Sequence, residues 1–109
     1  TNAAPNAATH TVKADLADIA AGNGYVAGGA DITGVYAESG GTGTLTATDV
    51  TFTASGGTVG PFRYAILYND TPTSPADPLI QYWDYGSAIT LADGETFTVD
   101  FGASVLTLT

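Results

Sequence analysis

The chain of 109 residues has no cysteine, and only Lys13 and Arg63 oppose its eleven acidic residues. Without cysteine the fold cannot be held by disulfides, and with a single histidine the usual zinc ligand sets are missing. Proteins bind nucleic acid through several Lys or Arg side chains that neutralise phosphates, so a net charge of −9 disfavours nucleic acid and anionic membranes as partners. No run of about 18 apolar residues is present, which excludes a transmembrane helix.

Catalytic groups are also scarce. The only imidazole, His10, lies in the least structured stretch of the sequence, and the GxSxG, HExxH and GK[ST] motifs are absent. Asp84 could serve as one of the two carboxylates of a glycosidase, but the other acids are scattered singly through turns, where aspartate favours turn geometry. We therefore expect a non-enzymatic protein with no catalytic residues and no cofactor, and a hydrolase is the least favoured alternative.

Two pairs of acids could contribute to a calcium site, because hard cations prefer clustered carboxylates. Asp70 and Asp77 frame one loop, and Asp15 and Asp18 lie one helical turn apart. Neither pair belongs to a DxDxDG loop, so solvated loop acids are the favoured interpretation. The sequence predicts no metal site.

Threonine and glycine dominate the chain, with 18 and 14 residues. Threonine favours strands through its branched Cβ, and glycine supplies turns. Apolar residues alternate with threonines, which is typical of an antiparallel sheet with one solvated face. Strands are predicted at Asp31–Glu38, Thr42–Thr48, Val50–Ala54, Phe62–Tyr68, Leu79–Tyr85, Ile89–Leu91, Glu95–Phe101 and Val105–Thr109, with a possible short one at Thr9–Val12. The sequence thus predicts an all-β, antiparallel β-sandwich or barrel-like domain of about eight short strands.

Turns and the N-terminal region complete this prediction. Asp93-Gly94, between alternating segments, predicts a hairpin, and the proline-rich Asn69–Pro78 predicts an exposed loop. Residues 1–8 are expected to form a flexible arm, and residues 9–109 a single domain. Apolar residues at helical spacing in Ala14–Ala21 predict one short helix, with a strand as the competing interpretation.

Aromatic residues gather in one predicted strand pair. Alternation places Trp83 and Tyr85 on one face of Leu79–Tyr85 and Tyr82 on the other. One face is expected to fill the core and the other to contact a subunit or stack against a sugar, although Trp83 could simply be a core tryptophan. Arg63 is expected to pair with an acid, for example on the adjacent strand. The candidate interface or glycan contacts are Tyr82, Trp83, Tyr85, Tyr64 and Arg63.

Four segments, taken in order, resemble a group of small virion structural proteins of tailed bacteriophages. They are Asp18–Gly29 (DIAAGNGYVAGG), Ala65–Pro72 (AILYNDTP), Pro78–Gly86 (PLIQYWDYG) and Glu95–Phe101 (ETFTVDF). The resemblance covers about Ala14 to Thr109, and no binding residues are transferred from it.

The resemblance implies a non-enzymatic capsid decoration (cement) protein on the outer shell of the virion, with a tail or fibre component as the alternative. The implied partners are the major capsid protein or neighbouring virion subunits, and a homo-oligomer such as a trimer. A carbohydrate-binding module that uses Trp83 and Tyr85 remains open on the residues alone.

Overall fold

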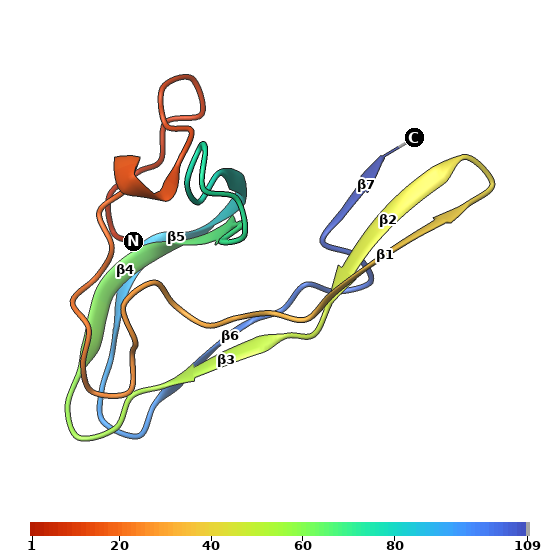
Figure 1. Cartoon of the computed structure of the whole chain (residues 1–109). Helices are drawn as coiled ribbons and strands as arrows, with labels where there is room; N and C mark the ends of the chain where they lie inside the picture. The colour runs from red at the N-terminus through yellow and green to blue at the C-terminus, as the bar shows by residue number, and fades with distance from the viewer. Residues whose placement is uncertain (109) are drawn as a thin grey trace.

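The computed structural model describes residues 1–108, which form seven strands and no α-helix in that range (Figure 1). All strand pairs are antiparallel, so the predicted all-β class is confirmed. The strands are β1 (Gly34–Ser39), β2 (Thr42–Ala47), β3 (Val50–Thr53), β4 (Val59–Tyr68), β5 (Leu79–Leu91), β6 (Thr96–Val99) and β7 (Leu106–Leu108). The segments predicted as Leu79–Tyr85 and Ile89–Leu91 are one continuous strand.

The strands are divided among three small sheets, with orders β1-β2-β7, β3-β6 and β4-β5. This differs from the sandwich or barrel that the sequence predicts. The β4–β5 and β3–β6 ribbons diverge like the two arms of a V, and β1-β2-β7 continues the β3–β6 arm (Figure 1). Two-stranded ribbons have no interior strand, so most of their surface stays open.

The two arms meet where two turns bind each other. The Gly94 amide donates to the Ala54 carbonyl (2.7 Å), and the Gly56 amide donates to the Asp93 carboxylate (2.9 Å). The hairpin predicted around Asp93-Gly94 is therefore wrong, because the turn exists but β5 and β6 pair with β4 and β3. The sequence predicted the turn correctly, but the choice of strand partners depends on contacts between residues that are far apart in the sequence.

The helix predicted at Ala14–Ala21 is also wrong. Only a 3₁₀ turn, η1 (Lys13–Asp15), forms there, and within residues 1–108 no helix is long and apolar enough to cross a membrane. The Asp15 carboxylate accepts hydrogen bonds from the Thr11 and Val12 amides, and the Val12 contact caps the start of this turn. Two helical turns would also be too short to be stable by themselves.

Other N-terminal residues lie against the β4–β5 ribbon. Val12 forms only an isolated bridge with Pro78, so the possible strand at Thr9–Val12 is absent. The Thr1 carbonyl accepts hydrogen bonds from the Arg63 and Tyr64 amides (3.0 and 2.9 Å). The predicted arm of residues 1–8 thus begins alongside β4.

The buried core is small. One cluster of buried residues lies near the vertex of the V and contains Ala54, Val59, Phe62 and Leu91. The chain exposes 6590 Å², whereas a compact protein of 10.9 kDa is expected to expose about 5600 Å². Its radius of gyration is 14.8 Å, against about 13 Å for a compact chain of this length. The fold therefore leaves about 1000 Å² more surface exposed than a compact domain.

Candidate assembly surfaces

The β4–β5 ribbon presents aromatic residues on both faces. Trp83 lies opposite Ala65 in the register and Tyr82 opposite Ile66, so Trp83 and Tyr82 point to opposite faces, as predicted. Trp83 is half-buried and meets Phe101 edge to face, with ring centroids 5.6 Å apart. Phe101 follows β6, so Trp83 faces the other arm of the V.

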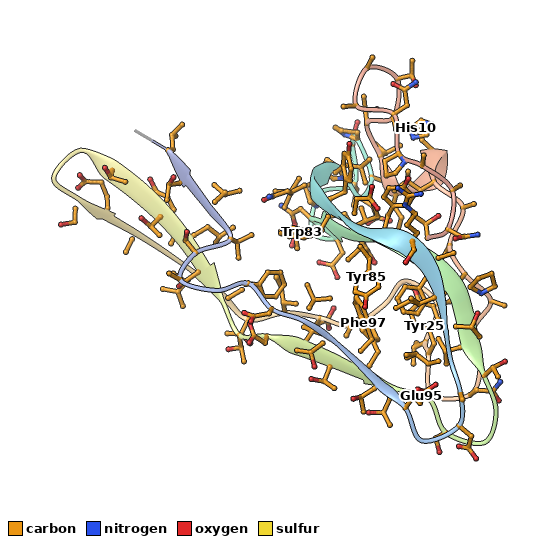
Figure 2. The ribbon with its side chains drawn as sticks, turned by 180° about the vertical axis from the view of Figure 1, so that it is seen from behind. His10, Tyr25, Trp83, Tyr85, Glu95 and Phe97 are labelled. Carbon is orange, nitrogen blue, oxygen red and sulfur yellow. The ribbon has the colours of Figure 1, made fainter. Side chains whose placement is uncertain are left out.

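Tyr85 lies on this same inner side. Its ring meets Phe97 of β6 at 5.6 Å, and Phe97 also meets Phe62 of β4 at 5.0 Å, both edge to face. Figure 2 shows Tyr85 and Phe97 close together in the space between the two arms. A cleft of about 1040 Å³ lies between the arms, lined by Trp83, Phe97 and Phe101 among others. Even so, Tyr85 is 59% exposed, so these contacts leave much of its ring uncovered.

The outer face of the ribbon carries Tyr64 and Tyr82. Their rings meet edge to face at 6.2 Å, and Tyr82 and Ile80 remain 43% and 45% exposed. A small groove of about 200 Å³ lies beside Tyr82 and is bordered by Asn6 and His10 of the N-terminal segment. His10 Nδ1 accepts a hydrogen bond from the Asn6 amide (3.0 Å), a local contact within that segment.

Arg63 and Asp84 form an ion pair across β4 and β5. Arg63 Nε and Nη2 donate to the two Asp84 carboxylate oxygens at 2.8 and 3.0 Å. The expectation that Arg63 pairs with an acid of the adjacent strand is confirmed. Hydrogen bonding from Arg63, and then from the Gly86 amide, lowers the pKa of Asp84 below its usual value. The pair neutralises the only arginine and fixes the local geometry of the ribbon.

Asp18 organises a contact that the sequence reasoning missed. Its carboxylate accepts hydrogen bonds from the Tyr25 hydroxyl (2.6 Å), the Gly28 amide (2.8 Å) and the Ile19 amide (2.9 Å). Burial alone would raise the pKa of Asp18, but these hydrogen bonds outweigh it and the pKa is lowered. Burial and then the Asp18 contact raise the pKa of the Tyr25 hydroxyl. These residues all belong to the segment Asp18–Gly29, which therefore forms one hydrogen-bonded loop.

Tyr68 attaches this loop to the end of β4. Its hydroxyl donates to the Gly28 carbonyl (2.8 Å), and Lys13 Nζ lies 5.6 Å from the centroid of its ring.

Among residues 1–108, no three His, Asp or Glu side chains lie close enough to hold a metal ion. Asp15 and Asp18 are hydrogen-bonded to backbone amides.

A second apolar surface, also missed from the sequence, lies on the β1-β2-β7 sheet. Tyr36 of β1 and Leu108 of β7 are 64% and 69% exposed on one face, and Val35 of β1 is 59% exposed on the opposite face. The Tyr36 ring extends over Gly43 of β2, which is buried as a result and leaves no room for a Cβ. Alternation along the strands could not reveal this exposure, because it depends on which elements of residues 1–108 pack against the sheet.

Comparison with family models, with curated proteins and with solved structures finds no match to this chain.

Proposed function

We propose that this protein is a structural subunit of a tailed bacteriophage particle, a capsid decoration (cement) protein that binds the outer shell and stabilises it. The observation that carries the proposal is the extent of exposed surface, which includes large hydrophobic side chains such as Tyr36 and Tyr85. A chain that exposes about 1000 Å² more than a compact domain has about the area that one partner contributes to a standard interface, about 800 Å². The four segments that resemble virion proteins supply the viral setting.

The charge distribution supports an outward location on the particle. The net charge of −9 would repel packaged DNA, and one of the two basic residues, Arg63, is already paired with Asp84. An acidic exterior subunit meets no such repulsion. Contact with the shell would be made through the exposed apolar side chains, because large exposed apolar patches mark interaction sites.

The decisive experiment is to locate the protein in purified particles of the virus that encodes it. Mass spectrometry should detect the chain in the particles, and electron microscopy at subunit resolution should show its density on the outer capsid surface. Particles lacking the protein should release DNA at a lower temperature, and adding the purified chain should restore the original release temperature. Density on the tail would support the tail or fibre alternative, while absence from the particles would overturn both.

The aromatic geometry does not favour the carbohydrate-binding alternative. Sugar rings stack on exposed aromatic faces that lie in a row, whereas Trp83 and Tyr85 turn inward and meet Phe101 and Phe97 edge to face. Of the three residues on β5, Tyr82 alone lies on the outer face, beside Tyr64. The glycan hypothesis stays a prediction that a binding titration can test.

A further inference from the structure

We propose that the free edge of β1 pairs antiparallel with β1 of a second copy of this chain, joining two β1-β2-β7 sheets into one continuous sheet. This pairing would be one contact within the proposed assembly. Only its biological setting rests on the proposed function. The starting observation is that β1 lies at an edge, with β2 on one side and no strand of residues 1–108 on the other. All six of its residues are exposed.

The β1–β2 hairpin determines which backbone groups of β1 are unpaired. Its turn is the two-residue Gly40-Gly41, both with positive φ (61° and 86°), as the tight hairpin turns that match strand twist require. In such a hairpin the flanking pair, Ser39 and Thr42, is hydrogen-bonded, and hydrogen-bonded pairs then alternate along the strands. The amides and carbonyls of Gly34, Tyr36 and Glu38 therefore point away from β2.

These outward groups fix the register of a symmetric pair. Outward-pointing residues of one copy must face outward-pointing residues of the other, since only these can exchange hydrogen bonds. The register with the greatest overlap places Tyr36 opposite Tyr36 of the second copy, with Gly34 opposite Glu38. Glu38 is the only charged residue of β1, and in this register it faces Gly34 of the second copy. No like charges therefore face each other directly. The two strands are self-complementary, as a two-fold symmetric interface requires.

The occupant is a second copy because β1 lacks the features that keep edges apart. Natural edge strands carry lysine, proline or bulges, whereas β1 contains neither lysine nor proline and pairs with β2 in continuous register. Its exposed Val35 and Tyr36 would gain apolar contacts across the new strand pair. The hairpin also approaches a like-charged copy at little electrostatic cost, since Glu38 is the only charge in Gly34–Ala47 while the chain carries −9.

Cysteine cross-linking tests this register without background, because the chain has no cysteine. Tyr36→Cys places two Cα atoms about 5.5 Å apart across the symmetry axis, within the range that a disulfide bridges. Val35→Cys, the matched control on the same strand, places them about 8 Å apart, beyond that range. Under mild oxidation Tyr36→Cys should give a covalent dimer and Val35→Cys should not. Equal cross-linking of both variants, or none in Tyr36→Cys, would overturn the proposed register.

Sedimentation equilibrium of the full chain tests the interface itself. The unsubstituted protein should have twice the mass of one chain. Tyr36→Lys, which sets two lysines face to face and keeps an aliphatic stem over Gly43, should weaken dimerisation at least tenfold. Thr46→Lys adds the same charge to the central strand β2 and should leave the dimer intact. A monomeric unsubstituted chain, or a dimer unaffected by Tyr36→Lys, would show that β1 does not join two copies.

The two proposals fail in distinguishable ways. A monomeric chain found on the capsid surface would refute the β1 pairing alone. A β1-linked dimer absent from particles would refute the virion function alone.

Discussion

Replacement of Asp18 by asparagine tests whether the Asp18–Gly29 loop is held by the carboxylate. The carboxylate accepts hydrogen bonds from two backbone amides and one hydroxyl, through both oxygens. Asparagine has one oxygen and one NH₂ group. Whichever way that amide is turned, either the Gly28 or the Ile19 N–H faces a donor and loses its acceptor.

The expected cost follows from the hydrogen bonds. A hydrogen bond to a charged group contributes about 1.5–3 kcal/mol, and one between neutral groups about 0.5–1.5 kcal/mol. Because Asp18 lies at the surface, where water can replace part of the loss, we expect Asp18→Asn to lower the free energy of unfolding by about 2 kcal/mol. That change reduces the folding equilibrium constant by about 30-fold.

Urea denaturation followed by the fluorescence of Trp83, the single tryptophan, measures this loss. Asp31→Asn is the matched control, because it removes the same charge from an exposed residue.

The pH dependence of stability supplies a second readout. The pKa of Asp18 is lowered in the folded chain, so its stabilising contribution is present above the unfolded pKa of about 3.9 and is lost as the pH falls through the lower folded pKa. The gap between the unsubstituted protein and Asp18→Asn should close in acid. Equal losses in Asp18→Asn and Asp31→Asn, or a gap that persists at low pH, would refute the reasoning.

Phe97→Ala removes two edge-to-face pairs worth about 0.5–1.5 kcal/mol each. The same urea denaturation should therefore show a free energy of unfolding lower by about 2 kcal/mol. An unchanged midpoint would mean that the two arms are not joined at Phe97. Gly24→Ala should cost more than Gly94→Ala, because both glycines have positive φ but only a Cβ at Gly24 meets a backbone carbonyl; equal losses would contradict that packing. In Arg63→Gln, an NMR titration should show the pKa of Asp84 rising toward its ordinary value, and a pKa that does not move would mean that the ion pair is absent in solution. Polysaccharides should leave the fluorescence of Trp83 unchanged, and a saturable change would revive the carbohydrate-binding hypothesis.

Several features of the fold and the candidate surfaces could be predicted from the sequence, because they depend on neighbours along the chain. Alternation of threonine with apolar residues located most strands, such as Thr42–Thr48, within a few residues of their bounds. The same period of two placed Trp83 and Tyr82 on opposite faces. The shortage of basic residues led us to expect no nucleic-acid partner, and the single arginine pointed to an ion pair across adjacent strands.

Strand partners and side-chain exposure were decided only by the tertiary structure. Asp93-Gly94 indicated a turn, but contacts from Ala54 and Gly56 direct it to join two ribbons in place of a hairpin. The apolar spacing of Ala14–Ala21 suited a helix, yet only the 3₁₀ turn Lys13–Asp15 forms, because so short a helix is not stable without tertiary packing.

The sequence by itself determined an acidic, threonine-rich, all-β chain, because composition and alternation act locally on each strand. Only the tertiary structure decided that its sheets stay narrow, that Trp83 turns inward and that Tyr36 lies on an uncovered edge. These outcomes depend on which strands, far apart in the sequence, pair with each other, and the periodicity of one strand does not determine its partners.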